Sequence, residues 1–261
     1  MGASRSVDYK MDLDPYPDDI LIVILSFVPA RDLVRNCRRV NRHWRHLVDS
    51  PTLWRNKCER EWSSEPFRGA LGVPNMNWQR ASVKSPFSRN LIKNPCGKEG
   101  LQHWRTVDRG DGWVVENNRT DLEGSECQKS FVTSFSWCEK TQIVSLLKEG
   151  LWEEILDSYQ PHICISDWFA GRDDCGCVYK ISVELLAADR ERVIDEFHEN
   201  PDPIPQWNDE SYHQVSHVFQ DYGPGVRYVK FNHKGRDTQF WKGWYGSRIT
   251  NSSVTVRFHK N

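Results

Sequence analysis

Four aromatic side chains fall within six positions near the C-terminal end, in the run FWKGWY at residues 240–245. An exposed ring can stack on the C–H face of a sugar, while a neighbouring cation or polar group bonds its hydroxyls. Strand alternation would divide the run into two faces: Phe240, Lys242 and Trp244 on one, and Trp241, Gly243 and Tyr245 on the other. If a sheet interior takes one set, the other is exposed or lies in a loop at the edge of the sheet. The run therefore indicates an aromatic binding surface, with burial in a core as the alternative.

The acidic segment SDWFAGRDDCGC is a second candidate, because it contains Asp167, Asp173 and Asp174. Paired carboxylates could serve as general acid and base in a hydrolase. Consecutive polar residues with two glycines are more typical of a solvated turn. The sequence also contains no P-loop, dinucleotide-binding, GxSxG or HExxH signature. We therefore expect no catalytic activity.

The eight cysteines could form disulfides or bind a metal: Cys37, Cys58, Cys96, Cys127, Cys138, Cys164, Cys175 and Cys177. Cys175 and Cys177 lack the CxxC spacing of a metal clamp. His213 and His217 have i, i+4 spacing, but their segment reads as a strand, where they would not meet as on a helix. Without a secretory signal, we expect reduced, mostly buried thiols, no metal and no cofactor.

Basic residues concentrate in residues 31–60, which hold nine Lys or Arg against three acidic residues. They could bind nucleic acid, but they interleave with apolar positions as on a solvated helix face, and the whole chain has a net charge of −1. We therefore expect no nucleic-acid partner. No apolar run reaches the roughly 18 residues that span a bilayer, so we expect a cytoplasmic protein without a transmembrane segment. The start MGASRS fits a myristoylation pattern at Gly2.

Helical spacing of apolar residues predicts three short helices in the N-terminal part of the chain. The first begins at Pro17 and ends before Pro29. Asp32 would cap a long second helix, and Ser50 would begin the third. Residues 20–28 read ILIVILSFV and are apolar nearly all round, which predicts that a partner protein covers the first helix.

From about residue 96 the apolar period changes to two, as in VYKISVELL and SVTVRFH. The segment RYVKFNHKGRDTQF predicts two strands joined by a turn at Lys234-Gly235, and residues 141–159 read as helical or turn-rich, with part of them open to a strand assignment. Strands without a βαβ rhythm indicate an antiparallel sandwich or barrel. The expected fold class is α+β: a small three-helix domain, a connector rich in Pro, Gly and Ser, and an antiparallel β-sandwich.

Residues 14–59 resemble an F-box. A proline-acid-acid start, an apolar helix ending in valine-proline, an aspartate-leucine, a Trp-Arg and a Leu-Trp follow in the order of that family, with Tyr16 where leucine is common. The resemblance implies docking onto the Skp-type adaptor of a cullin ubiquitin ligase. The residues implied for this contact are Pro17, Ile20, Leu21, Ile24, Leu25, Val28, Pro29, Leu33, Val40, Trp44, Leu53 and Trp54.

The remainder resembles the F-box-associated (FBA) domain of the sugar-recognising F-box proteins, from NLIKNPCGKEGLQHW through DWFAGRDDCGC and DYGPGVRYVKF to FWKGWYGSRITNSS. That domain is a sandwich of the galactose-binding-like, jelly-roll type, and its glycan-binding members hold the chitobiose core of N-linked, often high-mannose, glycans in a loop-end pocket. By motif, the pocket falls on Phe135, Asp174, Phe240, Trp241 and Lys242. Phe240 stands where a tyrosine is common, so one hydroxyl contact is lost, and the other two rings of the run are expected to be structural.

The resemblances imply a flexible start (1–11), an F-box (12–60), a linker (61–95) and an FBA domain (96–261). They imply a non-catalytic substrate-recognition subunit of an SCF-type (Skp-cullin-F-box) ubiquitin ligase. It would bind misfolded N-glycosylated proteins for ER-associated degradation, in the cytoplasm and at the cytosolic face of the ER. Because a fold alone does not carry an activity, two alternatives stay open: a ligase receptor for protein substrates without glycan binding, and a lectin-like protein that no longer engages the ligase.

Overall fold

The computed structural model describes residues 16–61, 72–74, 76–87, 89–125 and 127–258. The chain divides into a helical unit, to which residues 74–83 also belong, and a larger unit that runs from residue 84 onward. Each unit has its own core. The predicted flexible start and myristoylation site lie outside the described residues.

The helical unit contains α1 (Asp18–Ser26), α2 (Ala30–Arg35), a 3₁₀ turn (Cys37–Arg39), α3 (Arg42–Asp49), α4 (Pro51–Glu61) and α6 (Trp78–Lys84). The predicted first and third helices are confirmed as α1 and α4. The predicted long second helix is wrong, because it is broken into α2, the 3₁₀ turn and α3. Asn41 causes the break: its side-chain oxygen accepts a 2.8 Å hydrogen bond from the backbone N–H of Trp44 and caps α3. Asp32 lies within α2 instead of capping it.

The core of the helical unit is a single apolar cluster made of Leu21, Leu25, Leu33, Leu47, Val48, Leu53 and Trp54. Two cationic side chains of α4 form hydrogen bonds at the C-terminal end of α1. Lys57 Nζ donates to the carbonyls of Ser26 (3.2 Å) and Val28 (2.7 Å), and Arg60 donates to the carbonyl and hydroxyl of Ser26. These bonds satisfy carbonyls that the helix leaves free and place positive charge at the negative end of its dipole.

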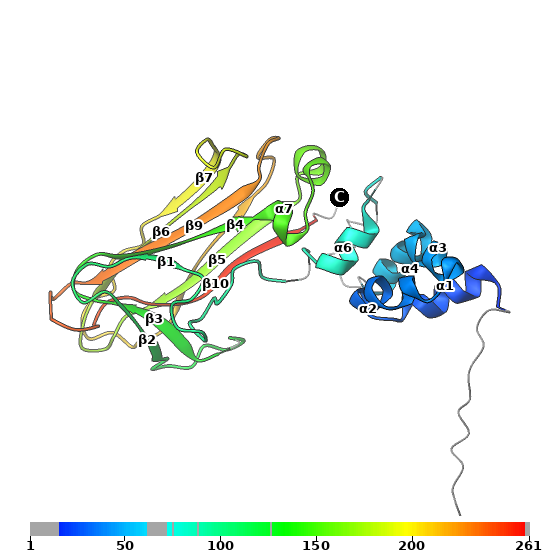
Figure 1. Cartoon of the computed structure of the whole chain (residues 1–261). Helices are drawn as coiled ribbons and strands as arrows, with labels where there is room; N and C mark the ends of the chain where they lie inside the picture. The colour runs from blue at the N-terminus through cyan, green and yellow to red at the C-terminus, as the bar shows by residue number, and fades with distance from the viewer. Residues whose placement is uncertain (1–15, 62–71, 75, 88, 126, 259–261) are drawn as a thin grey trace, which may run out of the picture. The chain divides into compact units, whose positions relative to one another are not determined.

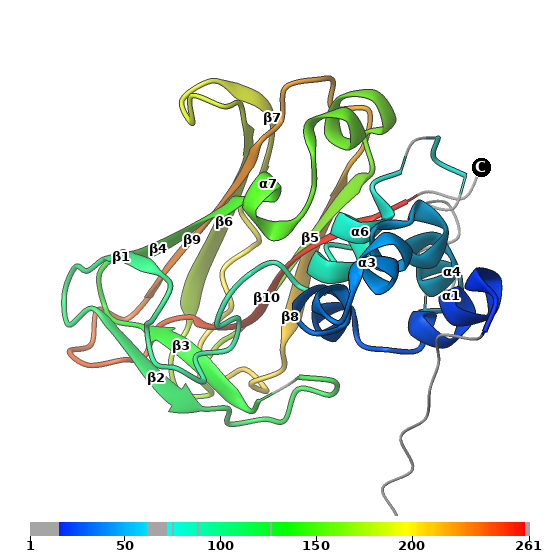
Figure 2. The same ribbon diagram turned by 45° about the vertical axis from the view of Figure 1, so that its right-hand side comes forward.

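The larger unit is a sandwich of two antiparallel five-stranded sheets within the described residues (Figure 2). One sheet has the order β1-β4-β9-β6-β7 and the other β2-β3-β10-β5-β8. The strands are β1 (Arg105–Val107), β2 (Trp113–Asn117), β3 (Lys129–Thr133), β4 (Cys138–Ser145), β5 (His162–Ala170), β6 (Cys177–Leu186), β7 (Val193–Glu199), β8 (His213–Phe219), β9 (Tyr228–Asp237) and β10 (Arg248–Arg257). The expected α+β class and antiparallel sandwich are confirmed.

The predicted turn at Lys234-Gly235 is wrong, because both residues lie inside the continuous strand β9. A glycine is needed at position 235 because neighbouring chain segments pack closely against its backbone, and not because the chain turns there. A Cβ there would lie 2.7 Å from the hydroxyl of Ser247 and 3.1 Å from the carbonyl oxygen of Val178. A glycine inside a strand marks such an approach as readily as a turn, and the sequence alone did not separate the two.

Residues 141–159 combine the two expected structures, since β4 is followed by α7 (Leu146–Glu149) and a π-helical turn (Ile155–Tyr159). Part of the segment assigned to the linker packs on the sandwich. Asn90 donates to the carbonyl of Ser252 (2.9 Å) and accepts from the backbone N–H of Val254 (3.0 Å), and the backbone N–H of Leu91 donates to the carbonyl of Val254 (2.8 Å).

A polar cluster lies between the two sheets, around the fully buried carboxylate of Asp167 on β5. The hydroxyls of Tyr179 (2.6 Å) and Ser252 (2.8 Å) donate to it, and Nδ1 of His233 lies 2.5 Å away. Burial, with a further contribution from Lys140, lowers the pKa of His233 to about 4. The imidazole is therefore neutral at physiological pH, and the four side chains tie both sheets together.

Lys140 on β4 is also fully buried, and aromatic rings surround its terminal nitrogen. Nζ lies 3.4 Å from the ring centre of Trp104 and 3.6 Å from that of Phe131. Burial lowers the pKa of Lys140 well below its usual value. Aromatic faces therefore take the place of water for this amine.

The expectation that the cysteines are unpaired thiols is wrong for Cys96 and Cys127, which form a disulfide. The two lie 31 residues apart in sequence, so no local spacing pattern pairs them. The other six cysteines are free, and four of these are buried: Cys58, Cys138, Cys175 and Cys177.

Candidate functional site

The aromatic run lies in the loop between β9 and β10, at the end of the sandwich opposite α7 (Figure 1). Its backbone leaves strand geometry because the buried carboxylate of Asp237 accepts hydrogen bonds from the N–H groups of Phe240 (2.6 Å) and Trp241 (3.2 Å). Farther along the loop, the N–H of Gly243 donates to Asp111 (2.8 Å). The strand alternation considered for these residues therefore does not apply, and the loop alternative holds.

Three rings of this loop are open to solvent. The exposed fractions are 64% for Phe240, 40% for Trp241 and 39% for Trp244, and Lys242 is also exposed. Burial raises the pKa of Asp237, while its backbone hydrogen bonds oppose that rise. Two carboxylates thus hold the loop in a fixed shape while its rings face outward.

Asp174 lies in the neighbouring β5–β6 turn. Arg172 forms an ion pair with its carboxylate at 2.6 Å and donates a hydrogen bond to it at 3.1 Å. The guanidinium of Arg172 lies 4.4 Å from the ring centre of Tyr245, whose ring packs edge-on against Trp241 at 5.6 Å. This chain of contacts joins Asp174 to the aromatic loop. The carboxylate of Asp174 is half-buried, and its Oδ1 is buried against Arg172, so only Oδ2 is left to accept from a ligand.

Phe135 lies in the β3–β4 turn. The two residues before it form hydrogen bonds with both ends of the aromatic loop. The N–H of Asp237 donates to the carbonyl of Ser134 (3.2 Å), and the N–H of Thr133 donates to the carbonyl of Ser247 (3.1 Å). The half-buried ring of Phe135 faces the backbone at Gly110, where a Cβ would lie 3.1 Å from it. The structure thus brings the segments of all five predicted glycan-binding residues to one end of the sandwich.

Cations flank this site on the outer face of the β4-β9-β6 sheet. The ring centre of Trp137 has Arg236 at 5.0 Å, Lys234 at 5.5 Å and Lys180 at 5.6 Å, and Arg236 also lies 5.2 Å from the ring centre of Phe240. The aromatic loop therefore borders a positively charged surface.

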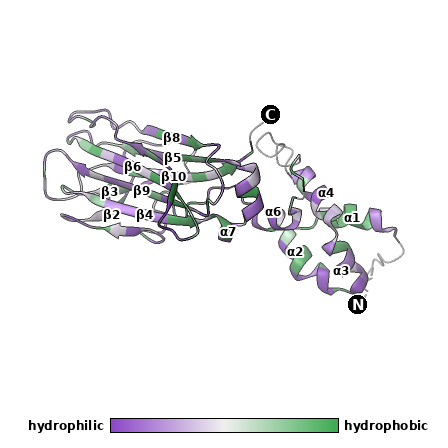
Figure 3. Ribbon diagram, turned by 90° about the horizontal axis from the view of Figure 1, so that it is seen from above, coloured by the Kyte–Doolittle hydropathy of each residue, from purple (hydrophilic) through white to green (hydrophobic). Residues whose placement is uncertain are grey.

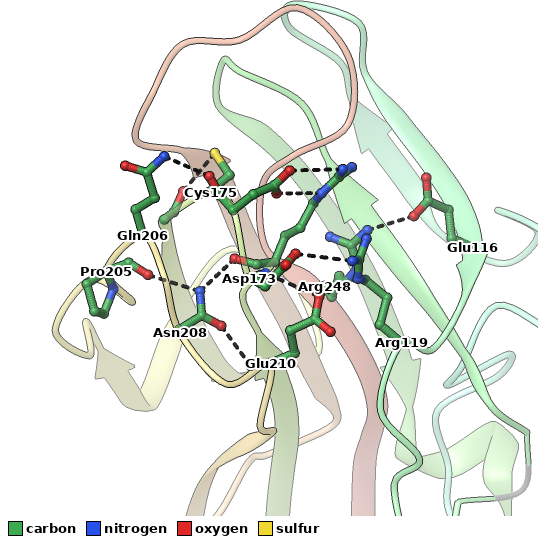
Figure 4. Close-up of polar contacts among 12 residues, drawn as sticks. Glu116, Arg119, Asp173, Cys175, Pro205, Gln206, Asn208, Glu210 and Arg248 are labelled. Carbon is green, nitrogen blue, oxygen red and sulfur yellow. Dashed lines mark hydrogen bonds and ion pairs between the residues drawn. The ribbon is translucent and has the colours of Figure 1, made fainter.

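A third loop at this end, residues 204–208, was missed by the sequence prediction. It bonds the β5–β6 turn through Gln206 and Asn208 (Figure 4). It contains Trp207, which has the highest exposed fraction among the exposed large hydrophobic residues of the described chain, 77%. A lone tryptophan among proline, asparagine and aspartate gave no periodic signal.

The residues of the hydrolase alternative do not form a pair of working carboxylates. Asp167 is buried between the sheets, Asp173 bonds Arg119 (3.1 Å), and Asp174 bonds Arg172. Across the part of the chain that the structure describes, no group of three or more His, Cys, Asp or Glu residues could hold a metal ion. The geometry here suits binding through rings and hydrogen bonds.

The predicted adaptor-binding residues divide into three classes. Leu21, Leu25, Leu33, Leu53 and Trp54 are buried in the core of the helical unit. Val28 and Trp44 are half-buried, and Pro17, Ile20, Ile24, Pro29 and Val40 are exposed. The buried residues can shape a docking surface only from beneath, so contact with a partner stays a prediction for the other two classes.

One face of α1, continued by Phe27 just after the helix, presents an apolar row to solvent. Ile20 is 44% exposed, Val23 51%, Ile24 41% and Phe27 66%. Positions three and four apart share one face of a helix, and Figure 3 shows the hydrophobic colouring of α1. Val23 and Phe27 were not predicted, although their helical spacing was the signal that could have found them.

Four of the nine basic residues in 31–60 are engaged within the helical unit. Besides Lys57 and Arg60 at the end of α1, Arg38 bonds Asp49 (2.7 Å) and Arg55 bonds Glu59 (2.8 Å). In the described residues, no helix is long and apolar enough to cross a membrane.

Two family models match the chain. One, described as F-box-like, matches residues 17–60, and the other, described as FBA, F-box associated region, matches residues 82–256. The chain belongs to the F-box proteins with an FBA domain. The resemblance stated from the sequence is thereby confirmed for both parts.

Curated relatives cover nearly the whole chain. F-box only protein 27 of Mus musculus is 47% identical over 95% of this chain and 91% of its own length. F-box only protein 17 of Homo sapiens is 43% identical over 98% and 99%. F-box only protein 6 of Homo sapiens is 42% identical over 98% and 88%.

Among solved structures, the chain is similar to TmCBM61 in complex with β-1,4-galactotriose. The TM-score is 0.42 and the identity 14%, over 65% of this chain and all of the other. It is also similar to the xylan-binding domain from CBM 22, with a TM-score of 0.37 and 7% identity over 67% and 99%.

Proposed function

We propose that this protein is the substrate-recognition subunit of an SCF-type ubiquitin ligase and that it binds the chitobiose core of N-linked high-mannose glycans. The helical unit holds the Skp-type adaptor, and the loop end of the sandwich holds misfolded glycoproteins. It works in the cytoplasm and at the cytosolic face of the ER, in ER-associated degradation.

The observation that carries the glycan proposal is the exposure of Phe240 and Trp241 on a loop that Asp237 and Asp111 hold in place. A fixed ring loses little conformational freedom when it stacks on a sugar. Trp241 stacks on an inner N-acetylglucosamine, with Phe240 and Phe135 beside its acetamide or ring edge. Asp174 and Lys242 hydrogen-bond its hydroxyls, each for a modest net gain.

The observation that supports adaptor binding is the exposed apolar row on α1. A row of this kind on a short helix favours burial against a partner protein. Once both ends are occupied, the ligase brings a charged ubiquitin-conjugating enzyme near the substrate lysines. The protein contributes proximity, which makes the transfer effectively intramolecular, and it needs no cofactor and performs no covalent chemistry.

Direct binding to a denatured high-mannose glycoprotein tests the proposal, with the full chain in complex with its adaptor. We expect saturable binding that free chitobiose removes and that Trp241→Ala weakens at least about thirtyfold, since truncating an aromatic anchor costs about 2 kcal/mol or more. Tyr159→Ala is the matched control, because Tyr159 is 37% exposed in the π-helical turn.

Binding that neither chitobiose nor Trp241→Ala changes would contradict the glycan proposal. It would favour the alternative receptor, which recognises protein substrates without sugar. Loss of adaptor binding by the intact chain would instead contradict the ligase assignment.

A further inference from the structure

Trp207 combines high exposure with an unfavourable backbone. Its side chain is 77% exposed and its φ is +65°. For a bulky residue this left-handed region is disfavoured, and a turn that needs it ordinarily uses Gly, Asn or Asp. Backbone strain of this kind concentrates at ligand-binding positions. Neither the exposed ring nor the strain is explained by stability.

Three consecutive hydrogen bonds fix the backbone on either side of this ring. The side chain of Gln206 donates to the carbonyl of Asp174 (2.8 Å), the N–H of Trp207 donates to the carbonyl of Asp173 (2.6 Å), and the side chain of Asn208 donates to the carbonyl of Arg172 (2.6 Å). Figure 4 shows the Gln206 and Asn208 side chains against this turn. The indole is thus presented on a rigid support.

The indole of Trp207 forms no ring, cation or hydrogen-bond contact within the described residues: no ring stacks on it, no cation lies over its face and its Nε1–H has no acceptor there. A ring whose position is fixed but whose faces are free is ready to stack on a ligand with little loss of entropy.

Trp207 belongs to the same loop end as the aromatic run. The β5–β6 turn, to which Trp207 is hydrogen-bonded, contains Asp174. At Gly176 this turn meets both the 204–208 loop and the aromatic loop. A Cβ on Gly176 would lie 2.6 Å from the hydroxyl of Thr238, at the start of the aromatic loop, and 2.7 Å from the carbonyl oxygen of Ile204. The N–H of Thr238 also donates to the carbonyl of Gly176 (2.9 Å). Ligands that enter at Trp241 and extend over the turn therefore approach Trp207.

The charged groups beside Trp207 are ion-paired, with a small acidic excess because one arginine serves two carboxylates. Arg119 bonds both Asp173 and Glu210, and the N–H of Asp173 donates to Glu210 (3.2 Å). Figure 4 also shows a separate ion pair nearby, between Arg248 and Glu116 (2.7 Å). An exposed ring beside paired charges that can still hydrogen-bond fits an uncharged polar ligand such as a sugar.

We propose that Trp207 is a second stacking platform, which binds a sugar of the same N-glycan beyond the chitobiose core. The inference rests on the proposed function, because it extends that site. It makes the protein bind long glycans more tightly than chitobiose alone.

Calorimetry with two free ligands, chitobiose and a released high-mannose oligosaccharide, tests the proposal on the full chain with its adaptor. The variant is Trp207→Asn, because asparagine accepts the left-handed conformation and keeps the backbone. We expect it to weaken oligosaccharide binding about tenfold and to change chitobiose binding less than about twofold. Trp207→Phe is expected to retain most of the affinity, and a thermal melt checks that each variant is folded.

The controls separate this inference from the proposed function. Trp241→Ala is expected to weaken both ligands, and Tyr159→Ala neither. If the unaltered protein binds neither ligand, the proposed function fails and this inference fails with it. If it binds both and Trp207→Asn binds them equally well, only the inference is overturned. Weaker binding of a glycoprotein but not of the free oligosaccharide would also overturn it, because Trp207 would then contact polypeptide.

Discussion

The two units both expose apolar side chains, but of different kinds and on different supports. On α1 the exposed residues are mainly aliphatic and form a continuous row on one helix face. At the loop end of the sandwich they are aromatic rings, flanked by Lys242, Asp174 and other polar groups. A continuous aliphatic row suits a protein partner that removes it from water. Rings among hydrogen-bonding groups suit sugars, which present both C–H faces and hydroxyls.

The supports differ as well. The α1 row lies on a regular helix above its own core. The exposed rings lie on irregular loops, and the carboxylates of Asp237 and Asp111 and the amides of Gln206 and Asn208 hold the backbone. Sites on loops need such a rigid scaffold beneath them. The comparison therefore predicts that the two surfaces act independently and that the sandwich interior maintains the second.

The largest effect is expected from charging the α1 row. Ile20→Asp with Val23→Asp should weaken adaptor binding about a thousandfold, since two carboxylates would be buried without partners in an apolar interface. Glycan binding by the same variant should be unchanged, and Trp241→Ala should give the reverse pattern. Surface plasmon resonance against each partner measures both.

Val193→Asp with Val218→Asp is the matched control, because both valines are similarly exposed, at 42% and 44%, on the edge strands of the sandwich. It should leave adaptor binding intact. Near-normal adaptor binding by the α1 variant, with its helical circular dichroism preserved, would show that the apolar row on α1 does not bind the adaptor.

The next effect concerns the sandwich interior and pH. The pKa of His233 is about 4 in the folded protein and about 6.5 in an unfolded chain. As the pH falls between these values, the unfolded state takes up a proton that the folded state does not, so stability is lost. The loss should reach about 3 kcal/mol at pH 4. Urea unfolding between pH 7.5 and 4 measures it.

His233→Gln should remove this part of the pH dependence of the unfolding free energy. The exposed control His198→Gln should retain it. The difference between the two variants is the readout, because carboxylates also titrate in this range. If the unfolding free energies of the two variants fall equally with pH, His233 does not cause the loss of stability in acid.

The smallest effect should come from restoring a hydroxyl at the stacking site. Phe240→Tyr should tighten chitobiose binding about fivefold, the equivalent of about 1 kcal/mol for one added hydrogen bond. Trp244→Phe should change it little, because the family motif places no sugar contact at position 244, although its ring is about as exposed as that of Trp241. Calorimetry measures both, and unchanged or weaker binding by Phe240→Tyr would place position 240 away from the sugar hydroxyls.

Much of the fold could be predicted because local rules and tertiary packing agree. The alternation in β6 and β10 and the start of α4 after Ser50 follow period and capping rules. The prediction failed where a distant group decided the outcome. Gly235 is required by Ser247 on the next segment, and Cys96 meets Cys127 only through the fold.

The candidate site was predictable only where a motif covered it. Phe240 and Trp241 stand in a recognisable run, whereas their loop geometry depends on Asp111, which is remote in sequence. Trp207 carried no sequence signal, since its importance rests on a left-handed φ and on hydrogen bonds to the turn at Asp173. Val23 could have been found from helical spacing, but motif matching passed over it.

In the proposed function, one chain links a glycan to the ubiquitin ligase. A reconstituted ubiquitination reaction tests it most directly, with the chain, its Skp-type adaptor, the cullin core and one denatured high-mannose glycoprotein, before and after enzymatic removal of its N-glycans. We expect that the glycosylated form is ubiquitinated, that the deglycosylated form is not, and that Trp241→Ala abolishes the difference. Equal modification of both forms by the unaltered chain would contradict it.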